Sequence, residues 1–268
     1  MAINLSDNGF STRKNRLYTI LCAVFLTNAL LAEIIGVKIF SAESTLGLQP
    51  MQIPLLSGAL DFNLTAGAII WPFVFITSDI INEYFGKTGV QRISIVTVLC
   101  IAYAFLMITV ATKLPPAQFW LDVNKNTGGK ADFNINTAFN NIFRQGGGII
   151  LGSISAFLLG QVLDVTVFHW LRRKTGPGQI WLRATGSTLV SQLADSFVVL
   201  GIAFYVFGNW SWQMVVSVGI INYIYKGAVA LLLTPLLYLA HSFIDKWLGP
   251  EHAHVLIEEA NDYKKDLV

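Results

Sequence analysis

Charged residues are scarce in this chain of 268 residues. Only 13% are charged while 54% are hydrophobic, and the mean hydropathy is +0.57. A soluble domain has about 25% charged residues, so this chain has too little polar surface to cover itself in water. The alternative is a soluble all-α protein with buried core helices, but the long uncharged runs favour membrane-spanning helices of about 20 residues each. The net charge of +2 is too small to indicate a nucleic-acid partner, and no basic tract with interleaved aromatic residues is present, so none is expected.

The residues of common catalytic and metal sites are also few. The two cysteines, Cys22 and Cys100, lie inside apolar runs, so neither a disulfide framework nor a metal site is indicated, and no cofactor is expected. The chain has no phosphate loop, no H-E-x-x-H and no G-x-S-x-G motif. The four histidines lie at or beyond the ends of the apolar runs. An enzyme is therefore disfavoured, and the chain cannot hydrolyse ATP by itself.

Six apolar runs predict an all-α membrane protein with six transmembrane helices. The predicted spans are 17–40, 64–85, 91–111, 147–171, 187–207 and 212–240. The first run is too long for a secretory signal and no small-residue cleavage site follows it, so we expect it to stay in the mature protein. The domain organisation is an N-terminal segment 1–16, a transmembrane domain 17–240 and a C-terminal tail 241–268.

The distribution of Lys and Arg predicts the orientation. The N-terminal segment, the second and fourth connections and the C-terminal tail hold twelve basic residues, against four in the third connection, 112–146. Basic residues concentrate on the cytoplasmic side of a membrane. Both termini are therefore predicted to be cytoplasmic and the 112–146 loop external, in a multi-pass protein of the inner membrane.

The long third connection also has internal features. Its start "PPAQFW" and centre "NKNTGGK" are typical of irregular structure, while "FNINTAFNNIF" predicts a short amphipathic helix at the membrane interface. Small residues follow at Gly148, Gly152 and Ala156, a spacing that favours close helix packing.

Ionisable residues inside the spans are the main functional signal. The predicted spans contain the carboxylates Glu33, Asp79, Glu83, Asp164 and Asp195, and the amines Lys38 and Lys226. Each such group costs about 2.5–3.5 kcal/mol at mid-membrane, and such groups usually face a bundle interior or a cavity. One carboxylate can be explained by a structural hydrogen bond. A set of this size favours a pathway for a small polar solute or an ion.

The spacing of the polar residues places them on shared helix faces. Asp79 and Glu83 are four residues apart, as are Asn222 and Lys226, and the pairs Gln161–Asp164 and Gln192–Asp195 repeat a Q-x-x-D spacing. That repetition leaves a weak internal repeat open. These groups, with Asn28 near the middle of the first span, are predicted to meet in one pocket in the inner half of the bilayer.

Two ionisable groups are predicted to lie apart from this pocket. Glu33 lies about 140° round the helix from Asn28 and nearer the outer surface. Lys38 is near enough to the end of its span to extend its amine outward.

Four segments resemble the queuosine precursor transporters of bacterial inner membranes. They are "WPFVFITSDIINEYFG", "GQVLDVTVFHWLRR", "WLRATGSTLVSQLADSFVVLGIAF" and "NYIYKGAVALLLTPLLY", within a similarity over about residues 20–240. The resemblance implies six helices and uptake of 7-deazaguanine bases: the cyano or aminomethyl precursors of the tRNA nucleoside queuosine, or queuine. The fold is expected to be similar to the membrane substrate-binding subunits of energy-coupling-factor transporters, by analogy alone.

The resemblance also implies site residues. The matching positions are Asp79, Gln161, Asp164, Asp195 and Lys226, with Asn28 in the first helix, while Glu83 is a position where members differ. The predicted substrate-binding set is Asn28, Asp79, Glu83, Gln161, Asp164, Gln192, Asp195, Asn222 and Lys226.

The chemistry of a guanine-like base is compatible with these residues. Its N1–H and exocyclic amine are two parallel donors that suit a carboxylate. Amides or Lys226 can donate to its acceptors, and an aromatic ring such as Trp71 or Phe75 can stack on its face.

Three alternatives stay open: a substrate-capture subunit that needs an external ATPase module, an ion-coupled carrier for a vitamin or other solute, and an intramembrane enzyme. The expected partners are a small-molecule substrate and the lipid bilayer. Self-association into a homo-oligomer and the preferred precursor stay open.

Overall fold

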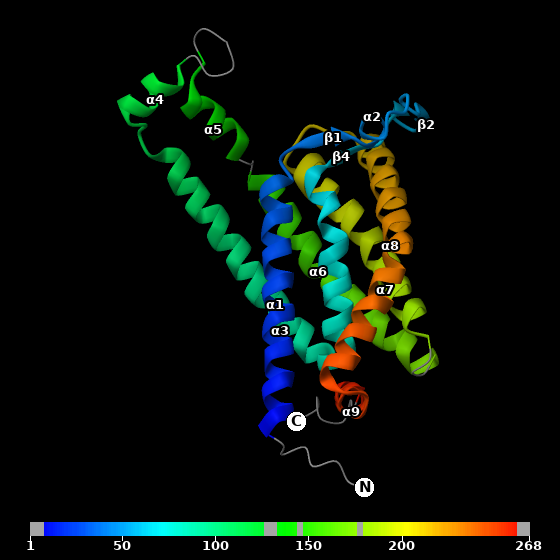
Figure 1. Ribbon diagram of the computed structural model, residues 1–268. Coiled ribbons are helices and arrows are strands. Elements are labelled where there is room, and N and C mark those ends of the chain that lie inside the picture. The colour runs from blue at the N-terminus through cyan, green and yellow to red at the C-terminus, as the bar shows by residue number, and fades with distance from the viewer. Residues whose placement is uncertain (1–7, 126–132, 144–146, 176–178, 262–268) are drawn as a thin grey trace.

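The computed structural model describes residues 8–125, 133–143, 147–175 and 179–261 of the chain. It is all-α apart from four three-residue strands. Five helices in this part are long and apolar enough to cross a membrane. They are α1 (Asn8–Ile35), α3 (Trp71–Lys113), α6 (Gly147–Thr175), α7 (Ile180–Leu200), which continues as a π-helical turn at Gly201–Val206, and α8 (Trp212–Leu248) (Figure 1).

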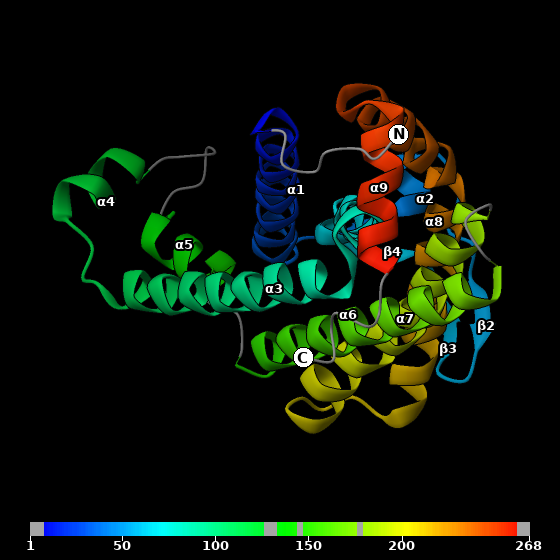
Figure 2. The same cartoon turned by 90° about the horizontal axis from the view of Figure 1, so that it is seen from below.

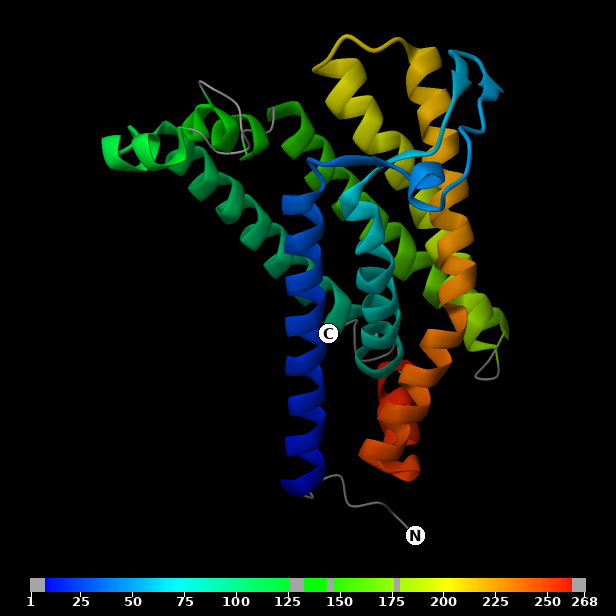
Figure 3. The same ribbon diagram turned by 45° about the horizontal axis from the view of Figure 1, so that its top comes forward.

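The predicted count of six spans differs from these five helices because of α3. The predicted spans 64–85 and 91–111 both fall largely within α3, and residues 64–70 belong to strand β4 (Asn63–Thr65) and the 3-10 turn η1 (Ala66–Ile69). Helix α3 is bent at Gly86 into two arms, 71–85 and 87–113 (Figures 1 and 3). Six membrane crossings therefore stay a prediction.

Glycine is required at the bend. Gly86 has φ 68° and ψ −172°, a backbone region that is essentially confined to glycine. A Cβ at this position would also lie 2.9 Å from the carbonyl oxygen of Ala260, in the C-terminal helix α9 (Pro250–Asn261). The bend thus allows α9 to approach the backbone of α3 closely.

Gly86→Ala is therefore expected to lower the free energy of unfolding by about 1–3 kcal/mol, from backbone strain and the close contact with α9. Thermal unfolding of the detergent-purified protein would measure the loss. Gly201→Ala is the matched control, because a Cβ at Gly201 meets nothing within 4 Å and the backbone there is helical. Equal melting temperatures for the two variants would contradict this account of the bend.

The connection between α1 and α3 forms a small folded cap, which the sequence did not predict. We use "cap" for residues 39–65. In it, β1 (Ile39–Ser41) pairs antiparallel with β4, and β2 (Ile53–Leu55) pairs antiparallel with β3 (Gly58–Leu60). The short helix α2 (Ala42–Thr45) follows β1. The cap lies across one end of the helices, and its Ser57 N–H donates to Ser217 Oγ of α8 at 3.2 Å (Figure 3).

A buried carboxylate holds the cap together. Glu43 accepts hydrogen bonds from the Phe62 N–H at 2.7 Å and from Ser41 Oγ at 3.1 Å. Loss of hydration raises the pKa of the Glu43 carboxyl, but the hydrogen bonds it accepts outweigh this effect, and its pKa is lowered.

The cap should therefore loosen in acid. Because the folded-state pKa of Glu43 lies below the unfolded value of about 4.3, its contribution is present above that pH and is lost as the pH falls through the folded-state value. Hydrogen exchange of the amides in 53–65 should accelerate below about pH 4.3, beyond its intrinsic pH dependence. Glu43→Gln should exchange faster at neutral pH and lose the acid step. An unchanged acid step in Glu43→Gln would assign it to another group.

The predicted 112–146 loop contains two short helices. Helix α4 (Gln118–Asn124) includes part of the "PPAQFW" segment, so the prediction of irregular structure there is wrong at residues 118–120. The "NKNTGGK" centre lies largely outside the described residues. Helix α5 (Ile135–Phe143) confirms a helix in "FNINTAFNNIF", while its place at the membrane interface stays a prediction.

Close packing at the small residues of α6 is confirmed. A Cβ at Gly148 would lie 2.4 Å from the Cβ of Phe207, and one at Gly152 would lie 3.0 Å from the carbonyl oxygen of Val199. Helix α6 can therefore approach α7 and the turn after it at backbone distance.

The basic segments gather at one end of the molecule. The start of α1, the bend of α3, the end of α6 with the start of α7, and the end of α8 lie at the end opposite the cap, α4 and α5, and α9 lies there too (Figure 1). Seen from that end, α9 lies beside the bend of α3 (Figure 2), and it packs on α3 and α8. Apolar side chains such as Ile95, Leu99 and Leu106 remain exposed along the second arm of α3, as expected of a surface that faces lipid.

Which end faces the cytoplasm stays a prediction. A cysteine placed at Asp122 should react with an impermeant thiol reagent added to intact cells, because α4 lies at the cap end and is predicted to be external. Labelling only after lysis would mean that the orientation is inverted.

Candidate functional site

Two cavities lie one above the other between the helices. The cap-side cavity has a volume of about 420 Å³ and is lined by residues from α1, the cap, η1, the start of α3, α5, α6, α7 with its π-helical turn, and α8. The inner cavity is lined by α3, α7 and α8, further from the cap, and measures only about 40 Å³. Small-molecule sites typically measure 300–1,000 Å³, so the cap-side cavity can admit a small organic molecule and the inner cavity holds only water-sized groups.

The polar groups of the cap-side cavity are few and include charges of both signs. They are Glu33, Thr65, Asn141, Ser153, Asp195, Asn222, Tyr225 and Lys226, among otherwise mainly apolar side chains. The Glu33 carboxyl is hydrogen-bonded with the Ser153 hydroxyl. An apolar lining with a few placed polar groups is the usual composition of a small-molecule site.

Trp71 and Lys226 line both cavities and so mark the boundary between them. The Lys226 ammonium donates to the Asp195 carboxylate and forms an ion pair that links α8 to α7. The side chains are 16% and 22% exposed, so the pair is neither fully solvated nor fully buried. A molecule that passes from one cavity to the other must contact this pair and the Trp71 ring.

The inner cavity contains polar atoms without partners. Asp79 is 4% exposed and Gln192 is 2% exposed, and both line this cavity. Neither Asp79 Oδ1 nor either amide atom of Gln192 has a hydrogen-bond partner among the described residues. Buried polar groups are almost always paired, and an unpaired one costs about 1–3 kcal/mol. A ligand that offers donors to Asp79 and both kinds of partner to Gln192 would remove this cost.

The structure divides the predicted site residues between the two cavities and the surrounding packing. Asp79 and Gln192 line the inner cavity, Asp195 and Asn222 the cap-side cavity, and Lys226 both. These five residues therefore come together, but along a path rather than in the single pocket that the sequence predicted.

Four predicted residues line neither cavity. The Asn28 amide donates to the Val24 carbonyl of its own helix at 3.0 Å. Gln161 Oε1 accepts from Ser78 Oγ at 3.2 Å and from Ser94 Oγ at 3.4 Å, while Asp164 Oδ1 accepts from Ser191 Oγ at 3.5 Å.

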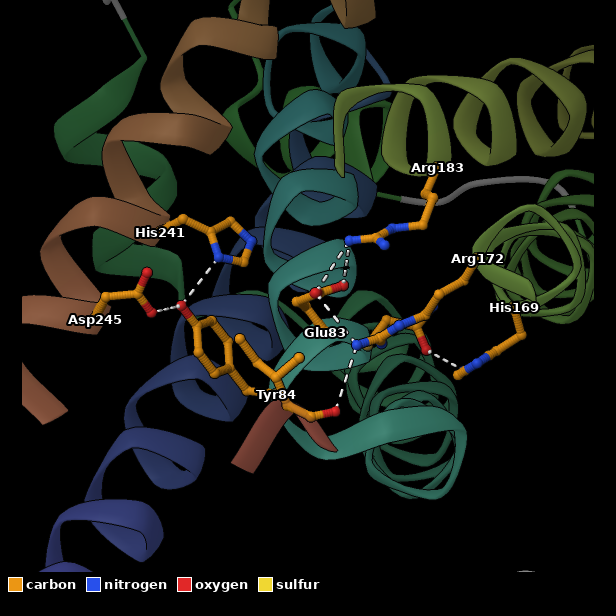
Figure 4. Close-up of polar contacts among 9 residues, drawn as sticks. Glu83, Tyr84, His169, Arg172, Arg183, His241 and Asp245 are labelled. Carbon is orange, nitrogen blue, oxygen red and sulfur yellow. Dashed lines mark hydrogen bonds and ion pairs between the residues drawn. The ribbon is translucent and has the colours of Figure 1, made fainter. Parts of the chain in front are cut away.

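Glu83, the fourth, belongs to an ion cluster at the end of the helices away from the cap. Its carboxylate pairs with Arg183 at 3.1 Å and with Arg172 at 3.3 Å (Figure 4). Arg172 also donates to the Ile257 carbonyl of α9 at 3.4 Å. The cluster therefore connects α3, α6, α7 and α9, and its geometry is that of a structural anchor.

A second polar cluster lies beside this one. The Tyr84 hydroxyl donates to Asp245 Oδ1 at 2.6 Å and lies 3.0 Å from His241 Nδ1, which joins α3 to α8 (Figure 4). His169 contacts Asn82 Oδ1 at 3.1 Å and joins α6 to α3. Together, the two clusters close the structure on the side of the inner cavity away from the cap.

Sequence reasoning missed several of these residues. Glu33 carried the signal of a carboxylate within a span but was placed apart from the pocket, because it does not share a helix face with Asn28. In the structure it is Glu33, and not Asn28, that lines a cavity. Arg172 and Arg183 were read only as markers of orientation, yet both are buried. No local pattern distinguishes a basic residue that folds back onto a carboxylate from one that faces solvent.

Within the described residues, no three His, Cys, Asp or Glu side chains gather as ligands of a metal ion would. The arrangement offers hydrogen bonds, charges and flat aromatic surfaces. Its chemistry suits binding and passage of a small polar molecule.

Comparison with known proteins gives a consistent result. Residues 65–240 match the family described as "Putative vitamin uptake transporter". The chain is 31% identical over 189 residues to the "Probable queuosine precursor transporter" of Bacillus subtilis, covering 68% of this chain and 75% of that protein. It is 31% identical over 155 residues to the "Queuosine precursor transporter" of Escherichia coli, covering 58% and 61% respectively. It is 27% identical over 191 residues to a protein of Haemophilus influenzae with the same printed name as the first, covering 68% and 71%. No solved structure matches the chain.

Proposed function

The chain belongs to this family of membrane transporters, and from that membership we propose that it imports a queuosine precursor, a 7-deazaguanine base, into the cytoplasm across the inner membrane. Family membership makes the chain a transporter and not an enzyme, and implies a small-molecule substrate. The deazaguanine cargo is the part that we propose. It rests on the names of the relatives and on the chemistry of the two cavities.

The observation that carries the proposal is the set of unpartnered polar atoms at the inner cavity. The base presents N1–H and an exocyclic amine side by side, which suits the two oxygens of the Asp79 carboxylate. The Gln192 amide can both donate to and accept from the same molecule. Both side chains have atoms without a hydrogen-bond partner among the described residues, so binding would satisfy groups that are otherwise buried at a cost.

The two cavities would then act in sequence. The cap-side cavity has the volume for a bicyclic base, and the Trp71 ring at its inner boundary offers a flat surface for stacking. The inner cavity is too small for the base in this conformation. Passage therefore requires the inner cavity to widen and the two polar clusters beyond it to open.

The decisive experiment is uptake in cells that cannot make queuosine. Labelled 7-cyano- and 7-aminomethyl-7-deazaguanine would be supplied with and without this chain, and queuosine in tRNA would be measured. We expect queuosine only when the chain is present. Equal incorporation without the chain, or none with it, would overturn the proposed cargo.

A variant at Gln192 separates binding from folding. Gln192→Leu removes amide atoms that lack hydrogen-bond partners within the described structure, so the melting temperature should be unchanged or slightly higher. Uptake should fall at least about tenfold, because one hydrogen bond to the base contributes about 1.4 kcal/mol or more. The control is Gln161→Leu, which removes an acceptor used by Ser78 and Ser94 and should lower stability. Full uptake by Gln192→Leu would place the base elsewhere.

A second candidate is a vitamin, which the description of the family favours. Competition distinguishes the two. An excess of each unlabelled vitamin should leave deazaguanine uptake unchanged, and a vitamin that abolishes it would become the preferred substrate.

A further inference from the structure

Two buried carboxylates, Asp79 of α3 and Asp164 of α6, lie where these helices are in contact. Two hydrogen bonds join α3 to α6 on either side of them: Ser78 Oγ donates to Gln161 Oε1 at 3.2 Å, and Asn82 Oδ1 lies 3.1 Å from His169 Nε2. Asp79 is 4% exposed and Asp164 is fully buried. They come from different helices, so the tertiary fold brings them together.

Neither carboxylate is neutralised by a cation in the described part of the chain. Their hydrogen bonding is also incomplete: Asp164 accepts from Ser191, but Asp164 Oδ2 and Asp79 Oδ1 have no partner there. The groups that bond to Asp164 are the uncharged hydroxyls of Ser187 and Ser191, and Asp79 lines the inner cavity.

The surrounding charges are already matched to one another. On α3, Glu83 pairs with Arg172 of α6 and Arg183 of α7, while Lys226 of α8 pairs with Asp195 of α7. Further along α8, His241 and Asp245 bond to the Tyr84 hydroxyl. The three cations Arg172, Arg183 and Lys226 are therefore engaged by other carboxylates, and His169 of α6 contacts Asn82 Oδ1 of α3.

Two like charges buried together are strongly unfavourable, and one bound proton removes the repulsion. The remaining carboxylate then keeps its charge and can accept hydrogen bonds. A second, independent feature points to a ligand at the same place: Gln192, 2% exposed, lines the inner cavity together with Asp79, and neither of its amide atoms has a partner within the described residues.

From this geometry we infer that the Asp79–Asp164 pair is a proton-binding site and that the chain moves its substrate together with a proton. The inference rests on the proposed function for the identity of the cargo. The proton is taken up by the pair from the outer aqueous side and released to the cytoplasm with the base. With the proton on Asp164, the Asp79 carboxylate is available to the donors of the base. No ATPase module is then needed to drive uptake.

The test uses the purified full chain in liposomes that contain the pH-sensitive dye pyranine and no ATP. The probe is 7-cyano-7-deazaguanine, an uncharged base, added outside with the membrane potential clamped. We expect the lumen to acidify as the base enters. An imposed gradient of one pH unit, acid outside, should raise the accumulation ratio about tenfold, which is the limit for one proton per base.

The outcomes separate the two proposals. Uptake of the base with no change in luminal pH and no effect of the gradient would overturn the proton site and leave the proposed cargo intact. No uptake under any gradient would overturn the cargo, and the coupling with it.

Asp164→Asn tests the residue assignment. The amide keeps the size and the oxygen that accepts from Ser191 but cannot release a proton. The variant should still exchange labelled for unlabelled base across the membrane, while luminal acidification and gradient-driven accumulation are lost. The matched control is Asp122→Asn, an exposed position on α4 bonded to Gln118, which should couple like the wild type. Continued proton movement in Asp164→Asn would overturn the assignment of the proton to this pair. If the variant does not fold, luminal acidification by the wild-type protein decides whether the base is carried with a proton.

Discussion

Glu83→Gln is expected to lower the free energy of unfolding by about 3–5 kcal/mol, which is the usual cost of breaking a buried ion pair. Glu83 is buried, and its carboxylate is shared by Arg172 and Arg183, whose side chains are 7% and 0% exposed. Glutamine keeps the shape but removes the negative charge, so the two guanidinium groups would lie buried and repel each other. The yield of folded protein and its melting temperature in detergent would measure the loss.

The control for this prediction is Glu259→Gln. Glu259 pairs with Lys14 at 2.8 Å on the surface, where the side chains are 32% and 34% exposed. Its loss should cost less than about 1 kcal/mol, because exposed ion pairs contribute little. If Glu83→Gln melts like the wild type and yet abolishes uptake, Glu83 contacts the substrate, as the sequence predicted, and the structural role is refuted.

The second large effect is expected at the Asp195–Lys226 pair. Lys226→Met leaves the Asp195 carboxylate without its ammonium partner in a partly buried position, and Asp195→Asn leaves the Lys226 ammonium without its carboxylate partner. Each single variant should lose folded protein as well as uptake, since removing one partner leaves a partly buried charge uncompensated.

The double variant Asp195→Asn with Lys226→Met separates structure from transport. It carries no uncompensated charge at this position, so the yield and melting temperature should recover toward the wild type. The double variant should therefore be destabilised by less than the sum of the two single variants. Uptake should stay at least about tenfold below the wild type, because both groups line the path between the cavities. Recovery of uptake with stability would show that the pair only holds α7 to α8.

The helices that could be predicted are those with an uninterrupted apolar run. Spans 147–171, 187–207 and 212–240 correspond to α6, α7 with its π-helical turn, and α8. The cap could not be predicted in this way, because its strands are three residues long and depend on pairing between residues far apart, such as Ile39 with Thr65. A run of three residues carries too little periodic signal to distinguish a strand from a loop.

The candidate site was predicted only in part, because the sequence reveals candidate residues but not their partners. Carboxylates and amides within apolar helices are visible in the sequence, since the membrane makes each of them costly, and this signal identified Asp79, Gln192, Asp195, Asn222 and Lys226. Their partners are not visible, because partners come from other helices. Glu83 carried the same signal as Asp79, four residues away, and only the position of Arg172 and Arg183 distinguishes an ion cluster from a cavity wall.

The sequence by itself determined that this protein is helical, lies in a membrane and keeps polar groups among its helices, because composition and periodicity act locally along the chain. The tertiary structure alone decided which of those groups meet. In the structure, α3 is bent at Gly86, Lys226 pairs with Asp195, and α3 contacts α6 where Asp79 and Asp164 are buried, between the Ser78–Gln161 and Asn82–His169 hydrogen bonds. Contacts between helices depend on how each helix is rotated and packed against its neighbours, and the pattern along a single helix does not contain that information.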